Sequence, residues 1–155
     1  MTVHEQTKQN PFRLLEKGCL LLNPSVADKA GLISLLVHRL CQGRPQLDPA
    51  YITSQVLARE KGVSTTLDTG LSIPHARVEE LDDFAAAMAV FHTPLADGKA
   101  HPVRVMFLFL SPAKAEFFPK HLQLLAALAK TFTAEVVDQV TSCPDEASVR
   151  ALLAR

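Results

Sequence analysis

Two near-continuous apolar runs constrain the fold of this chain most strongly. Residues 85–91 and 103–110 contain Arg104 as their only charged side chain. Turn-forming residues separate and follow the two runs, namely Pro94, Asp97, Gly98, Pro102, Ser111 and Pro112. Strands that are apolar along both faces are typical of the centre of a sheet covered by helices on each side. We therefore expect these runs to be two central strands.

The residues that precede these runs predict one more strand and two helices. The short apolar run 19–22 predicts a strand. Apolar side chains then recur at helical spacing over residues 26–41, and Ser25 is the expected N-cap of that helix. Asp48 followed by Pro49 is typical of a helix start, and this helix should continue to about residue 61.

The C-terminal third is predicted to be helical. Residues 116–132 are amphipathic, and their expected apolar face is made of Phe118, Leu122, Leu125, Leu128 and Ala129. Two further helices are expected over 134–141 and 145–153. Helices before and after a few strands predict an α/β fold, a mixed central β-sheet flanked by helices on both faces in a three-layer sandwich. With 155 residues we expect one domain over 12–155, preceded by a flexible tail over 1–11.

The composition argues against several classes of function. Sixteen basic residues balance sixteen acidic ones, so no net charge attracts nucleic acid or anionic lipid. The first ten residues are polar and do not form a signal peptide, and the apolar runs are too short to cross a bilayer, so no membrane insertion is expected. Three widely spaced cysteines form neither a metal motif nor an even disulfide set, which favours a reducing compartment. The predicted location is the cytoplasm.

The polar segment 63–77 is the strongest candidate for a functional site, and we expect it to be mainly a loop with a short strand-like piece at residues 71–73. His75 offers a neutral ring nitrogen that is a competent nucleophile near pH 7. Pro74 restricts the backbone directly before it. Arg59 and Arg77 could bind phosphate oxygens through charge-assisted hydrogen bonds. An isolated histidine in such a loop is more often structural, so the residues alone leave the role of His75 open.

The other histidines have simpler interpretations. His121 lies on the apolar face of its helix, where a histidine usually belongs to the core and satisfies one hydrogen bond. The remaining four have no spacing typical of metal ligands: His4, His38, His92 and His101. We therefore expect no metal site.

Several motifs in a fixed order resemble a known family. Residues 59–60 read Arg-Glu, residues 64–65 read Ser-Thr, and residues 70–77 read Gly-Leu-Ser-Ile-Pro-His-Ala-Arg. Together they resemble the signature of fructose/mannitol-type (type 2) IIA domains of the bacterial phosphoenolpyruvate-dependent phosphotransferase system. The segment 119–126, Pro-Lys-His-Leu-Gln-Leu-Leu-Ala, also resembles the family, and the similarity runs from about Phe12 to the C-terminus. The sequence shows no fused permease, so within this family we expect the free-standing nitrogen-regulatory branch over a sugar transporter component.

The resemblance implies a phosphocarrier and assigns residues to it. His75 matches the phosphorylated histidine, His121 the supporting histidine, and Arg59 the arginine that stabilises the phosphate. Hydroxyl positions beside the site are matched by Ser64 and Thr65. The implied donor is HPr or its nitrogen-branch relative, and the implied further partner is a downstream IIB domain or a regulatory target; no cofactor is implied. The family fold, a mixed sheet flanked by helices, agrees with the layers expected above.

Two alternatives remain open from the sequence. Thr66 and Asp68 stand where the family usually carries glycines, and a carboxylate near an incoming phosphate would repel it. The chain could therefore be a phosphotransfer-deficient regulatory binding module of the same fold. Residues 67–70, Leu-Asp-Thr-Gly, also match the active-site string of dimeric aspartic proteases, which would use Asp68. Those proteases are nearly all β, whereas the helical segments predicted here are long.

Overall fold

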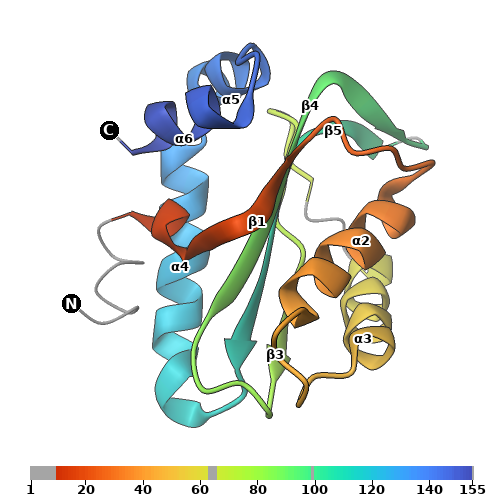
Figure 1. The fold of residues 1–155 in the computed structure, drawn as a ribbon, viewed down its shortest axis with the longest axis vertical. Coiled ribbons are helices and arrows are strands. Elements are labelled where there is room, and N and C mark those ends of the chain that lie inside the picture. The colour runs from red at the N-terminus through yellow and green to blue at the C-terminus, as the bar shows by residue number, and fades with distance from the viewer. Residues whose placement is uncertain (1–9, 63–65, 99, 155) are drawn as a thin grey trace.

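The computed structural model describes residues 10–62, 66–98 and 100–154, so most of the expected tail over 1–11 lies outside the described residues. The elements follow one another along the chain (Figure 1) as 3-10 helix η1 (Pro11–Leu14), β1 (Leu15–Leu22), α2 (Lys29–Cys41), α3 (Pro49–Gly62), β2 (Leu71–Ser72), β3 (His75–Val78), β4 (Ala85–Asp97), β5 (Ala100–Pro112), 3-10 helix η2 (Ala115–Phe117), α4 (Phe118–Thr131), α5 (Ala134–Thr141) and α6 (Glu146–Leu153).

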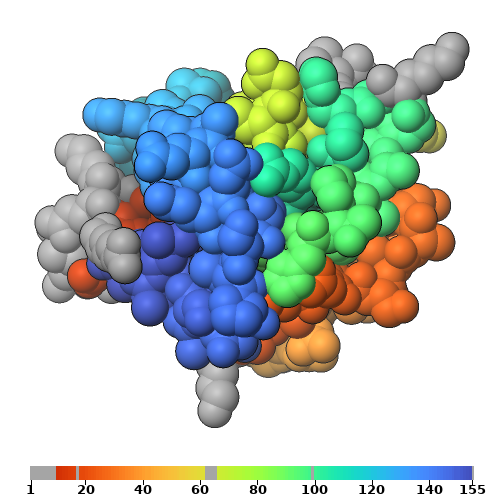
Figure 2. Space-filling model, turned by 90° about the horizontal axis from the view of Figure 1, so that it is seen from above, coloured from red at the N-terminus to blue at the C-terminus, as the bar shows by residue number. Residues whose placement is uncertain are grey.

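The described strands form one mixed five-stranded sheet in the order β1-β4-β5-β2, in which β3 also pairs with β5. β1 runs parallel to β4, β4 and β5 are antiparallel, and β2 and β3 both run parallel to β5. Helices α2 and α3 cover one face of this sheet, and α4, α5 and α6 cover the other (Figure 1). Seen from above, the C-terminal helices (blue) and α2 (orange) lie on opposite sides of the strands (green; Figure 2). The predicted three-layer α/β fold is confirmed.

The central strands are buried on both faces, as their apolar runs predicted. Along β4, Met88 and Val90 belong to the core cluster shared with the C-terminal helices, whereas Ala87 and Ala89 belong to the cluster shared with α2. The same alternation occurs along β5. None of the helices in the described part of the chain is long and apolar enough to cross a membrane.

Both central strands are longer than the apolar runs that predicted them. β4 continues through Pro94 to Asp97 and β5 already includes Pro102, so these prolines lie within the strands and do not end them. The outer ends of the two strands are largely exposed, and the pairing shifts register between Val90 and Leu95. Proline is tolerated in strands where the ladder is irregular. Gly98, with φ +56°, lies in the turn between the two strands.

The expected helices are present, and the cap of α2 differs from the prediction. Asp28, not Ser25, caps α2, because its carboxylate accepts a hydrogen bond from the backbone N–H of Gly31 at 2.8 Å. In α3 the predicted start is confirmed: the carboxylate of Asp48 accepts a hydrogen bond from the N–H of Ala50 at 3.1 Å. Helices α5 and α6 begin at the caps Thr133 and Asp145.

The predicted apolar face of α4 is wrong by about one residue. The buried side chains are His121, Leu124 and Leu128, whereas Phe118 and Leu122 are 46% and 49% exposed. The reason is that Phe117, at the end of η2, is the phenylalanine that enters the core. Because leucines occupy two adjacent faces of this helix, the hydrophobic pattern alone did not identify the face that is buried.

Candidate functional site

His75 lies on a strand, at the edge of the described sheet, and not in the loop expected from the sequence. β2 and β3 follow each other along the outer side of β5, where Leu71 pairs with Val105 and His75 pairs with Phe109. The carbonyl of Pro74 between them accepts a hydrogen bond from the N–H of Phe109 at 3.2 Å. The strand-like piece expected at residues 71–73 is confirmed by β2. Local periodicity did not predict β3, because its partner strand is far away in the chain.

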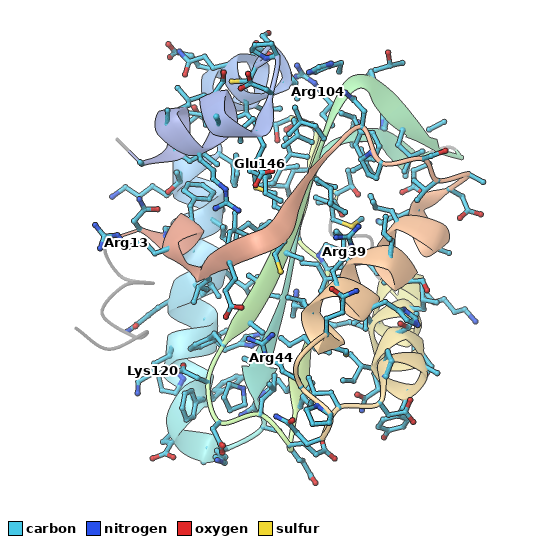
Figure 3. The ribbon with its side chains drawn as sticks, in the orientation of Figure 1. Arg13, Arg39, Arg44, Arg104, Lys120 and Glu146 are labelled. Atoms are coloured by element: carbon cyan, nitrogen blue, oxygen red, sulfur yellow. The ribbon has the colours of Figure 1, made fainter. Side chains whose placement is uncertain are left out.

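The contact between Gly70 and Arg104 positions the start of β2 beside β5. Gly70 has φ +91°, and an added Cβ would lie 2.6 Å from the Arg104 side chain, so only glycine fits there. Arg104 extends from β5 toward α5 (Figure 3), where it pairs with Asp138 at 2.8 Å and donates to the hydroxyl of Thr141 at 3.0 Å. The close approach of Gly70 to β5 thus fixes the direction of the chain that leads to His75.

The imidazole of His75 is buried and held in one tautomer. Its side chain is 5% exposed and stacks on the Phe109 ring, with centroids 5.2 Å apart. Nδ1 lies 2.8 Å from the carbonyl oxygen of Ile73. Because a carbonyl can only accept, Nδ1 carries the proton. Nε2 is therefore left with a free lone pair, and it is buried with no hydrogen-bond partner in the described part of the chain.

The structure brings His121 from α4 against His75. The two ring centroids are 5.1 Å apart at an interplanar angle of 69°, and His121 is also 5% exposed. Nδ1 of His121 lies 2.6 Å from the hydroxyl oxygen of Ser111, at the end of β5. The expectation that His121 belongs to the core with one hydrogen bond is confirmed, and the same residue also lies beside His75.

Burial keeps both imidazoles neutral near pH 7. It lowers the pKa of His75, and the positive charge of Arg59 lowers that pKa further. Burial also lowers the pKa of His121, to about 4, with additional lowering by His75 when that ring is protonated and by the charges of Arg77 and Arg59. Neutral imidazole is the nucleophilic form, so the pair is ready for attack on an electrophile without first losing a proton.

A hollow beside His75 offers cationic side chains to an anion. Its volume is about 280 Å³, and it is lined by Gln55, Arg59, His75, Ala76 and Arg77. Arg59 comes from the last turn of α3 and is exposed. Arg59, His75 and Arg77, predicted from the sequence as candidates, therefore line one hollow.

Arg77 is fixed at the rim of this hollow. Its guanidinium lies over the Phe118 ring, 5.1 Å from the centroid, and donates to the carbonyl of Lys114 at 3.0 Å. Its Nε is buried with no hydrogen-bond partner among the described residues. The Nε–H group of Arg77 could therefore donate a hydrogen bond to a bound anion.

The remaining predicted residues are not all placed. Ser64 and Thr65 lie outside the described residues. Thr66 accepts a hydrogen bond from Lys29 at 3.1 Å. Asp68 is exposed, in a turn closed by the N–H of Gly70 and the carbonyl of Leu67 at 3.0 Å. Glu60 is a described carboxylate whose charge raises the pKa of His75.

Three residues of the site were not singled out from the sequence. Phe109 was hidden within an apolar run and was assigned only to the core. Ser111 was interpreted as a turn residue, although a serine directly after such a run was a usable signal. Gln55 carried no signal. Among residues 10–62, 66–98 and 100–154 the structure has no group of three or more His, Cys, Asp or Glu side chains that could hold a metal ion.

Comparison with known proteins identifies the family. The model of the family "Phosphoenolpyruvate-dependent sugar phosphotransferase system, EIIA 2" matches residues 13–155. The chain belongs to this family. As an EIIA chain it is a phosphotransfer component of that system, and the resemblance found in the sequence is confirmed. The aspartic protease alternative is wrong, because the family and the helical layers are those of EIIA.

Similar proteins support the same assignment. A nitrogen regulatory protein of Pseudomonas aeruginosa is 28% identical over 137 residues, which cover 85% of this EIIA chain and 86% of the relative. The structure of nitrogen regulatory protein IIA-Ntr from Neisseria meningitidis matches with a TM-score of 0.78 at 26% identity, over 91% of this chain and 97% of the other. Enzyme IIA of the Escherichia coli mannitol system, solved in complex with phosphorylated enzyme IIB, shares the fold with a TM-score of 0.71 at 18% identity, covering 90% and 96%.

Proposed function

We propose that this EIIA chain accepts a phosphoryl group on Nε2 of His75 from HPr or its nitrogen-branch relative, in the cytoplasm. It then passes the group to a IIB domain or uses its phosphorylation state as a regulatory signal. One observation carries the proposal: Nε2 is neutral, buried and unpartnered in the described chain, while Nδ1–H is held by the carbonyl of Ile73. The ring therefore presents a single nucleophilic atom.

The transfer exchanges one phosphorus–nitrogen bond for another. The lone pair of Nε2 attacks the phosphorus of the donor phosphohistidine, and the donor's phosphorus–nitrogen bond breaks with its electron pair returning to the donor imidazole. The His75 ring becomes cationic, and the hydrogen bond from Nδ1–H to Ile73 stabilises that charge. Arg59 and Arg77 would donate to the phosphoryl oxygens, and His121 would orient the His75 ring or donate to a phosphoryl oxygen.

The similar proteins favour the regulatory branch over sugar transport. Both the Pseudomonas aeruginosa relative and the Neisseria meningitidis structure carry the name nitrogen regulatory protein. The mannitol enzyme shares less than a fifth of its residues with this chain and supports the fold alone. A regulatory target that responds to the phosphorylation state of His75 is therefore the partner that we propose first.

The proposal is tested by incubating the protein with phosphoenolpyruvate, enzyme I and an HPr-like donor and measuring its intact mass. The wild-type chain should gain one phosphoryl group, in an acid-labile and base-stable adduct. His75→Ala should gain none, and His121→Ala and Arg59→Ala should gain it about 10- to 1000-fold more slowly, as expected for loss of one positioned donor. Because His75 is buried, His75→Gln and a thermal unfolding curve control for misfolding.

The same assay decides between the proposal and its alternative. A folded wild-type chain that gains no phosphoryl group from either donor would favour the phosphotransfer-deficient binding module. A His75→Ala variant that is phosphorylated at the wild-type rate would instead move the acceptor to another residue.

A further inference from the structure

Gln55 lies one helical turn before Arg59 on α3, and its amide lines the hollow beside His75. The amide Nε2 donates to the hydroxyl of Tyr51 at 3.3 Å. The other end of the amide, Oε1, is buried and has no hydrogen-bond partner in the described part of the chain. Leaving a buried amide oxygen unpaired is destabilising, so its position needs a compensating role.

Unpartnered polar atoms gather at this hollow. In the described residues, four buried side-chain nitrogen or oxygen atoms have no partner: Thr53 Oγ1, Gln55 Oε1, His75 Nε2 and Arg77 Nε. The atoms of Gln55, His75 and Arg77 belong to side chains that line the hollow beside His75. Buried polar groups are normally satisfied, and exceptions concentrated in one cavity indicate that the cavity receives a polar group.

We propose that Gln55 is a further phosphoryl-binding residue of this site, which donates from its amide to an oxygen of the phosphoryl group on His75. The inference rests on the proposed phosphorylation of His75. The hydrogen bond between Gln55 and Tyr51 can run in either direction, because the Tyr51 hydroxyl can donate as well as accept. When the amide turns over, Oε1 accepts from the Tyr51 hydroxyl and Nε2 faces the phosphoryl group, so the bond to Tyr51 is kept.

Gln55 would add a neutral hydrogen-bond donor to the site, which Arg59 and Arg77 do not supply. Both arginines are permanent cations, and each lowers the pKa of a histidine in the pair. A neutral amide can stabilise a phosphoryl oxygen without opposing the positive charge that forms on the His75 ring. Gln55 therefore stabilises the phosphorylated state at no electrostatic cost to the ring.

The experiment compares Gln55→Glu with Gln46→Glu, which introduces the same charge at an exposed position in the loop between α2 and α3. The rate of phosphoryl gain from the HPr-like donor is measured by intact mass at low and at physiological salt. We expect Gln55→Glu to be slower than wild type by about tenfold or more, since it replaces a donor by a repelling carboxylate. Salt should narrow this deficit by screening, and Gln46→Glu should match wild type.

A second variant separates phosphoryl binding from packing. Gln55→Met keeps the volume of the side chain and removes its donors, so it should slow transfer about tenfold at either salt concentration while its thermal unfolding stays near that of wild type. Phosphorylation of Gln55→Glu and Gln55→Met at the wild-type rate would overturn the role of Gln55 and leave that of His75 intact. A wild-type chain that gains no phosphoryl group would overturn both.

Discussion

The chemistry of His75 and His121 follows from where their rings are buried. A histidine with two ordinary water-exposed nitrogens would be partly protonated near neutral pH and would present either nitrogen. Here the carbonyl of Ile73 fixes the proton of His75 on Nδ1, and the Phe109 ring covers one face of the imidazole. Selectivity for one nitrogen therefore comes from the Ile73 carbonyl, whereas the neutral, nucleophilic form at pH 7 comes from the burial of the ring, which lowers its pKa.

The buried histidines should make the stability of the protein depend on pH. In the unfolded chain His121 binds its proton near its usual pKa of 6.5, whereas in the folded chain its pKa is lowered to about 4. Between these values the unfolded state binds more protons, so the free energy of unfolding is retained in full above pH 6.5 and falls as the pH drops toward 4. By about pH 5 the contribution of His121 to this loss should be roughly 2 kcal/mol.

Urea unfolding at about pH 7.5 and about pH 5 measures this effect. His121→Asn removes the titrating ring, so its free energy of unfolding should fall less than that of wild type over the same interval. Equal losses in the two proteins would show that other groups account for the pH dependence.

Among the elements, α4 has two functions. Its buried side carries His121 into the core beside His75, and the neighbouring side exposes Phe118 and Leu122. Phe118 stacks near His121, with centroids 6.4 Å apart, so the exposed side begins directly at the site. Apolar side chains beside the reacting atom are suited to a small, transient carrier interface, since net charge provides little long-range attraction in this chain.

We expect Leu122→Asp to slow phosphoryl gain from the HPr-like donor by about tenfold, because it places a charge in that contact. Thermal unfolding should change little, since the side chain is exposed. Ala129→Asp is the matched control: it lies on the same side of α4, two turns farther along, and is also exposed. Similar rates for the two variants would place the donor contact elsewhere.

At the scale of the whole molecule, the sequence predicted what depends on local pattern. The apolar runs in β4 and β5, the cap at Asp48 and the helical spacing are local signals, and they were enough for the three-layer fold. His75 was assigned to a loop because the strand that pairs with it lies elsewhere in the chain. The buried face of α4 was missed because it depends on which phenylalanine, Phe117 or Phe118, enters the core.

The site residues also divide into those that a local motif identified and those that only the tertiary structure revealed. His75, His121 and Arg59 were found through a motif, whereas Ser111 and Gln55 became visible only through contacts with residues distant in the chain. Hydrogen-bond partners and shared cavities are properties of the tertiary structure, and a single sequence does not encode them as a pattern.

The sheet order has a consequence for how the site opens. β4 and β5 are joined by a tight turn that contains Gly98. His75, in contrast, pairs with Phe109 across 34 positions of the chain (75 to 109). On its other side, β3 has no neighbouring strand in the described sheet. Pairing over longer loops loses more chain entropy, so the β3 edge should detach at lower free energy than the hairpin. Amide hydrogen exchange should accordingly be faster in β3 than in the central part of β4. Equal protection of the two strands would contradict the prediction that the β3 edge opens more easily. Transient opening of that edge would give a donor access to a nitrogen that the closed structure keeps from solvent.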